Sequence, residues 1–177
     1  MNEYQFTLKF ALKDAEADFD AIVERLGDEG CTDALVGIGQ PGRIGLDFTR
    51  EAGSAGEAVL SAFRDVKRAI PDAELVEAAP DLVGLTDIAN FLGFTRQNMR
   101  KLAIQVGSEF PPPVHEGTPT IWHLSSILDW IKSRGTHHVD DWLHEVARTN
   151  MQCNLVNELH KHKLEPALQK DVLRLIG

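Results

Sequence analysis

Apolar and polar residues alternate at the start of the chain, which is the pattern of a half-buried strand. The apolar positions in this alternation are Tyr4, Phe6, Leu8, Phe10 and Leu12. A change to helical spacing follows, and Asp14 is expected to open the helix. Its apolar face consists of Phe19, Ile22, Val23 and Leu26.

Alternating stretches and stretches with helical spacing follow one another to about residue 80. The expected elements are strands over 34–38, 44–48 and 73–77, with a helix over 55–70 between the last two strands. The resulting order, β-α-β-β-α-β, is that of a ferredoxin-like domain, which we assign to residues 1–80. We therefore predict a four-stranded antiparallel sheet with two helices on one face.

One glycine motif in this part could be taken for a nucleotide-binding loop. Residues 37–42, Gly-Ile-Gly-Gln-Pro-Gly, fit the G-x-G-x-x-G pattern after a predicted strand. A dinucleotide site also needs the third glycine to open a helix that holds the pyrophosphate. The residues after Gly42 alternate as a strand instead, so the sequence favours a hairpin turn.

The middle of the chain, residues 84–104, has the pattern of two short helices joined by a tight turn. Thr86 is expected to cap the first helix and Thr95 the second, because a threonine hydroxyl can accept from an unpaired helical amide. Gly93 falls where the first helix must end, and glycine tolerates the left-handed conformation found at such ends.

The second of these helices leaves polar and basic side chains on its outward face. They are Arg96, Gln97, Asn98, Arg100 and Lys101. Arginine can donate two hydrogen bonds to guanine, asparagine or glutamine can bind adenine, and basic side chains neutralise phosphates. The set suits a helix that enters the major groove of DNA, and the alternative is an ordinary solvated helical face.

The residues that follow predict a small hairpin and a third helix. Two short strands are expected around a turn at Glu116-Gly117-Thr118, and the segment 124–131 is expected to contain a helix capped at Ser125 or Ser126. A helix-turn-helix, a hairpin and another helix together make a winged helix.

Residues 83–135 resemble the winged-helix domain of excisionase, AlpA-like and MerR-like DNA-binding proteins. The segments that carry the resemblance are LTDIANFLGFTRQNMRKL, FPPPVHEG and IWHLSSILDWI. The resemblance implies sequence-specific binding to double-stranded DNA, usually as a dimer or a cooperative array. His115 and Thr118 in the wing join Thr86, Thr95 and the outward set as candidate DNA-binding residues, and His123 could also touch a phosphate. A solvent-facing strand position is the alternative for both histidines.

The net charge of −9 is distributed unevenly along the chain. Residues 1–82 carry 8 Lys or Arg and 17 Asp or Glu, whereas residues 83–135 carry 5 and 4, a net +1. Weak non-specific DNA binding is therefore expected, with specificity supplied by base contacts and dimerisation. The acidic N-terminal domain is a candidate to bind a protein or small-molecule partner.

Composition indicates a globular protein without a membrane segment. The hydrophobic share of 43% and the charged share of 25% are ordinary, and no apolar run approaches the roughly 18 residues of a membrane helix. The first residues lack the pattern of a secretory signal, and Cys31 and Cys153 belong to no paired motif. We expect a cytoplasmic protein with reduced thiols.

Residues 136–177 are expected to form a helical tail with more apolar surface than a lone helix pair can hide. An apolar stripe runs from Val139 to Leu159 over a possible break at residues 149–150, and Glu165-Pro166 opens a last helix. The tail either folds back on the body or packs against a second copy. We favour a homodimer, because DNA readers of this kind commonly use two-fold symmetry.

No pattern of catalytic or metal-binding residues was found. The neighbours His137 and His138, like His160 and His162, do not share a helical face and lack partners at ligand spacing. A hydrolase could use Ser125 or Ser126 together with His123 and Asp129, but the sequence has no nucleophile-elbow motif around either serine. We therefore expect no enzyme, no metal and no cofactor.

The sequence leaves two classes of function open. The first is an α+β DNA-binding regulator with a ferredoxin-like domain, a central winged helix-turn-helix and a helical tail. The second is a protein-interaction adaptor in which the winged helix is a scaffold that binds no DNA. Duplex binding that depends on the outward side chains separates the two.

Overall fold

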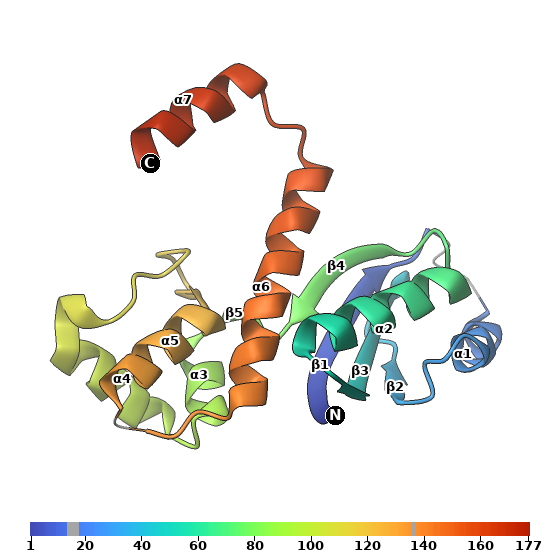
Figure 1. The fold of residues 1–177 in the computed structure, drawn as a ribbon, viewed down its shortest axis with the longest axis horizontal. Coiled ribbons are helices and arrows are strands. Elements are labelled where there is room, and N and C mark those ends of the chain that lie inside the picture. The colour runs from blue at the N-terminus through green and yellow to red at the C-terminus, as the bar shows by residue number, and fades with distance from the viewer. Residues whose placement is uncertain (14–17, 136) are drawn as a thin grey trace.

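A four-stranded antiparallel sheet forms the N-terminal part of the computed structural model, which describes residues 1–13, 18–135 and 137–177 (Figure 1). Its strands are β1 (Asn2–Ala11), β2 (Ala34–Gly37), β3 (Arg43–Ala52) and β4 (Glu74–Ala79). They are arranged in the order β2-β3-β1-β4, and each neighbouring pair is antiparallel. Helices α1 (Phe19–Asp28) and α2 (Ala55–Ala69) pack on the apolar face, as predicted.

The alternation seen in the sequence produces the core of this sheet. Phe6 pairs with Phe48 and Leu8 with Leu46 across β1 and β3, and all four are buried. The rings of Phe6 and Phe48 stack with centroids 5.2 Å apart. Because side chains two residues apart point to the same face, the intervening polar residues lie on the other side of the sheet.

The glycine motif lies in a hairpin, as the sequence favoured. β2 ends at Gly37 and β3 begins at Arg43, whose amide donates to the carbonyl of Gln40 at 2.9 Å. Gly42 has a φ of +72°, a conformation that suits glycine. No helix opens after it, so the motif does not form the helix N-terminus that a dinucleotide site requires.

The start of α1 differs in part from the expectation. Asp14 lies outside the described residues, and the helix that is described begins at Phe19. Asp18 caps it, since its carboxylate accepts from the amides of Asp20 and Ala21 at 3.1 and 3.3 Å.

A buried arginine also links the elements of this domain. The Arg50 guanidinium donates to the carboxylates of Asp33 and Asp65, each with a shortest distance of 2.7 Å. Burial alone would lower the pKa of Arg50, but the hydrogen bonds to Asp33 and Asp65 reverse this and leave it above its ordinary value. Two of the acidic residues therefore have internal partners.

The second part of the chain has a core of its own. Its elements are β5 (Leu82–Val83), α3 (Leu85–Phe91), α4 (Arg96–Val106), the 3-10 turn η1 (Gly107–Glu109), β6 (Trp122–His123) and α5 (Leu124–Arg134). β5 and β6 pair as a short antiparallel sheet. The buried side chains include Ile88, Met99, Leu124, Ile127 and Leu128.

Helix α6 (Asp141–Lys161) packs against both cores (Figure 1). Val146 belongs to the first core, Leu143 and Ala147 belong to the second, and Trp142 contacts both. The helix is continuous, so the expected break at residues 149–150 is wrong. The first half of the tail folds back on its own chain, which corrects our preference for a second copy at that stretch.

The joint between the two parts is a buried hydrogen-bonded segment. The Asp81 carboxylate lies 2.7 Å from Nδ1 of His123 and accepts from Nδ2 of Asn154 at 2.8 Å. Asn154 on α6 also donates to the carbonyl of Ala78 and accepts from its amide, each at 2.8 Å. The Asp81 side chain is fully buried, so these contacts fix the joint rather than leaving it a flexible tether.

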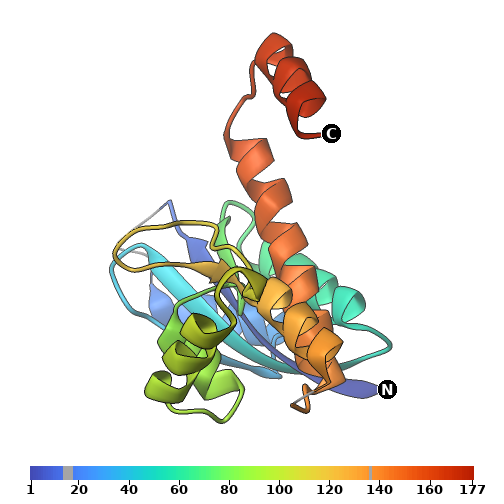
Figure 2. The ribbon, with the colours of Figure 1, turned by 90° about the vertical axis from the view of Figure 1, so that its left-hand side faces the viewer.

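The end of the chain extends away from the two cores. Helix α7 (Pro166–Ile176) lies beyond the end of α6, and all of its residues are exposed (Figures 1 and 2). Within residues 1–13, 18–135 and 137–177, no helix is long and apolar enough to cross a membrane.

The buried joint generates a stability prediction. We expect Asp81→Ala to lower the free energy of unfolding by about 1–3 kcal/mol, because two donors inside the joint lose their acceptor. Chemical denaturation would measure the change. Asp129→Ala is the matched control, since Asp129 lies 2.6 Å from His144 but is largely exposed. Its effect is expected to stay within about 0.5 kcal/mol, and equal effects would contradict a special role for the joint.

Candidate nucleic-acid interface

Helix α3 begins one residue before the expected cap. Gly84 is the N-cap residue, and the Asp87 carboxylate accepts from the amide of Gly84 at 3.0 Å. Thr86 therefore lies inside the first turn, where it is exposed, and the expectation that it caps the helix is wrong. Asp87 instead supplies the acceptor at the start of this helix, because its carboxylate reaches back to the amide of the N-cap residue Gly84.

The turn after α3 has the geometry that the sequence predicted. Gly93 adopts a φ of +67°, and the amide of Phe94 donates to the carbonyl of Ala89 at 2.7 Å. A side chain at residue 93 would be strained in this conformation. The turn therefore sets the angle at which α4 leaves α3.

Thr95 caps α4 as expected. Its hydroxyl oxygen accepts from the amide of Asn98 at 3.1 Å. Met99 is fully buried, and Leu102 is packed against the same core. Because these two hold one side of the helix inward, the opposite side faces solvent.

The outward set lies together on that exposed side. Arg96, Gln97, Asn98, Arg100 and Lys101 are all exposed. Residues 83–135 contain two other cations, Lys132 and Arg134, which pair with Asp141 at 2.7 Å and with Glu109 at 2.8 Å. Among the described residues, no carboxylate lies within ion-pair distance of the three cations of α4. Their charges are free for an anionic partner.

The fold adds residues to this face that the sequence did not single out. A hollow of about 320 Å³ beside α4 is lined by Asn98, Lys101 and Gln105 together with His137. The His137 and Phe94 rings pack edge to face, with their centroids 4.6 Å apart. Gln105 follows Lys101 by one helical turn, so helical periodicity could have placed it on this face. His137 is far away in the sequence, and only the tertiary fold brings it beside α4.

The wing is looser than the expected pair of strands. His115 and Ile121 form an isolated bridge, and the turn at residues 116–118 lies between them as predicted. The first arm contains residues 111–113, three prolines that lack an amide donor, so it cannot extend a ladder. The second arm continues into β6, which pairs with β5 instead.

The wing candidates have different surroundings. His115 and Thr118 are exposed, and the His115 ring lies so close to Gly117 that a side chain there would displace it. Nδ1 of His123 lies 2.7 Å from the Asp81 carboxylate in the joint, and a phosphate contact by this residue stays a prediction. Figure 2 shows α4 and the wing on the same side of the molecule.

Helix α5 starts without the predicted serine cap. It begins at Leu124, whose amide donates to the carbonyl of Asp81 at 2.7 Å. Ser125 is buried and donates to the Met151 sulfur at 3.2 Å. The expectation that Ser125 or Ser126 caps α5 is therefore wrong, because the joint determines where this helix begins.

The described residues contain no group of three His, Cys, Asp or Glu side chains that could hold a metal ion. The polar side chains that do lie together on α4 are hydrogen-bond donors and cations rather than metal ligands. Such a face is suited to bind an anionic surface with hydrogen-bonding edges, such as a nucleic acid.

In comparisons with known proteins, no family model, no curated protein and no solved structure matches this chain.

Proposed function

We propose that this chain is a sequence-specific double-stranded DNA-binding protein, a cytoplasmic transcriptional regulator that reads the major groove with α4. One observation carries the proposal. The three cations of residues 83–135 that have no ion-pair partner among the described residues, Arg96, Arg100 and Lys101, lie on one exposed helical face with Gln97 and Asn98. This combination supplies both phosphate neutralisation and base-edge recognition.

The proposal includes two fold assignments. We assign α3, α4, the loop of residues 110–121 and α5 to a winged helix-turn-helix, supported by the Gly93 turn and the Thr95 cap. We assign residues 1–80 to a ferredoxin-like domain, supported by the antiparallel order β2-β3-β1-β4. Its excess of acid makes it a candidate to bind a protein or small-molecule partner away from DNA.

The residues of α4 are proposed to have separate roles. Arg96, Gln97 and Asn98 lie in the first turn, nearest to base edges when a helix enters the groove by its N-terminus. Arg100 and Lys101 lie one turn further on and are assigned to phosphates. Exposed His115 and Thr118 in the wing would contact the backbone beside the groove.

A protein-interaction adaptor is the second candidate. Ile104 favours it, because this residue of α4 is 68% exposed beside the polar set, where a protein partner could cover it. An adaptor predicts no duplex binding at any salt concentration, whereas a regulator predicts enrichment of a preferred site.

The base-reading role is tested by selection from random duplexes followed by affinity measurements. Asn98→Ala or Arg96→Ala is expected to cost about 1–3 kcal/mol on the preferred site and little on random DNA, because base contacts carry discrimination. If no sequence is enriched, the proposal fails and the adaptor takes its place.

The phosphate role is tested by salt titration on the same DNA. Lys101→Ala is expected to weaken binding to preferred and random duplexes alike, and to lower the salt slope by about one. Lys132→Ala is the matched control, because Lys132 is already paired with Asp141, and it should leave the slope unchanged. Identical behaviour of Lys101→Ala and Asn98→Ala on both DNAs would overturn the assigned roles.

A further inference from the structure

Helix α7 presents an apolar face that no other described residue of the chain covers. Leu168, Val172, Leu175 and Ile176 lie on this face, with exposed fractions between 42% and 86%. An isolated helix shorter than about 12 residues is marginal in water, and α7 has 11. A stable α7 therefore needs a surface to pack against.

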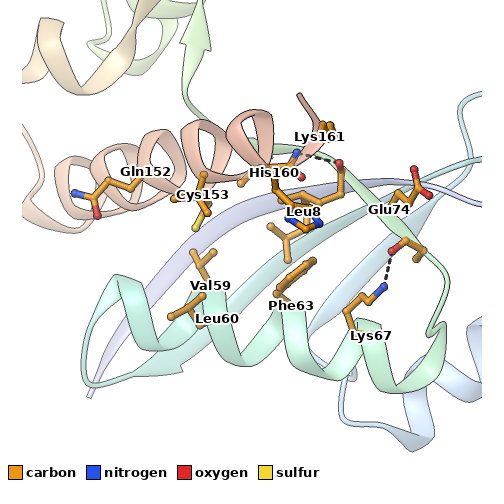
Figure 3. A pocket seen from close by; sticks show the side chains of 15 residues that line it. Leu8, Val59, Leu60, Phe63, Lys67, Glu74, Gln152, Cys153, His160 and Lys161 are labelled. Carbon is orange, nitrogen blue, oxygen red and sulfur yellow. Dashed lines mark hydrogen bonds between the residues drawn. The ribbon is translucent and has the colours of Figure 1, made fainter. Parts of the chain in front are cut away.

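An apolar groove of about 830 Å³ lies elsewhere on the same molecule, between α2 and the second half of α6 (Figure 3). Leu8 and Phe63 lie in its interior, and Cys153 of α6 also lines it. Leu60 and Val156 line it from opposite sides and are 45% and 65% exposed. Both apolar surfaces, the groove and the α7 face, are thus left open to water.

The groove and the helix match in length. At about 1.5 Å per residue, α7 is about 16 Å long. The stretch of α6 that lines the groove runs from Gln152 to Lys161 and is about 15 Å long by the same rise.

They also match in charge. Helical spacing places Asp171 beside the apolar face of α7, and Lys170 and Arg174 on the far side. The groove is lined by Lys67, Lys161 and one carboxylate, Glu74, and Lys161 already pairs with Glu158 at 3.2 Å. The Lys67 ammonium donates to the carbonyls of Pro71 and Ala73, and no carboxylate of the described residues pairs with it. A third N–H and the positive charge remain for Asp171.

The direction of α7 indicates whose groove it fills. α6 runs straight to Lys161, and the short segment 162–165 then turns α7 to the side of α6 opposite α2 (Figure 1). The helix therefore points away from its own groove. Reciprocal exchange between two copies would bury both surfaces and leave neither unmatched, since a two-fold contact closes on itself.

We propose that α7 docks as a helix in the α2–α6 groove of a second copy of this chain, so that two chains exchange their last helices. This inference does not depend on DNA binding. It replaces the broader expectation of a dimer through the whole tail, because the first half of α6 is occupied by its own chain.

Cys153 provides a direct test, because its thiol lies in the groove. We would introduce Val172→Cys in the full chain, with Cys31→Ala to remove the other native thiol, and oxidise it mildly. Burial raises the pKa of Cys153, so a mildly alkaline buffer is used. The expected product on a non-reducing gel is a disulfide-linked dimer that reductant returns to monomer.

Matched variants identify the partners of that disulfide. Lys170→Cys places the thiol on the polar side of the same helix and should cross-link far more slowly. Cys153→Ala in the Val172→Cys chain should abolish the dimer band. A disulfide within one chain would show that α7 fills its own groove, and the absence of any link through Cys153 would show that it fills neither; both results overturn the proposal.

Light scattering on unmodified thiols gives an independent readout. The wild-type chain is expected to have the mass of two chains at micromolar concentration, and Val156→Glu to have the mass of one. Val156 is exposed, so this variant should fold, which circular dichroism would check. Leu35→Glu changes an exposed residue of β2 away from the groove and should remain dimeric. A wild-type monomer, or a dimer indifferent to Val156→Glu, contradicts the proposal.

Discussion

The packing of α6 against two cores is the constraint on which the rest of this structure depends. Leu143 and Ala147 complete the core around α3, α4 and α5, while Val146 completes the core of the sheet. Both cores bury side chains of this one helix, and burial of apolar surface is the main favourable contribution to folding. The two parts of the chain are consequently stabilised together rather than as independent units.

The hydrogen bonds at Asp81 give this packing a defined geometry. Apolar contacts are non-directional, whereas the carboxylate of Asp81 accepts only along a few directions, from Asn154 on α6 and from His123 at the start of α5. The same joint supplies the carbonyl that pairs with the first amide of α5. The position of the α4 face relative to the acidic sheet domain follows from these contacts, since no flexible linker separates them.

Much of the candidate site could be predicted because its determinants are local. The Thr95 cap acts over three residues, the Gly93 turn over five, and the exposed side of α4 follows from helical periodicity. Where the sequence failed, another group, near in the sequence in two cases and distant in the third, had changed the local outcome. Asp87 and Gly84 displaced Thr86 at the start of α3, prolines loosened the first arm of the wing, and the joint displaced the serine cap of α5.

By itself, the sequence determined the strands and helices of the sheet domain, the hairpin at Gly37–Gly42 and the polar face of α4. These features follow from the two-residue repeat of strands and the 3.6-residue repeat of helices, which depend only on residues close together in the sequence. Only the tertiary structure decided that α6 is one helix shared by two cores, that His123 belongs to the joint and that every residue of α7 is exposed. The Asp81–His123 pair spans 42 residues and the Asn154–Ala78 pair spans 76. Contacts at such separations depend on how the elements pack, and no local pattern of residues encodes them.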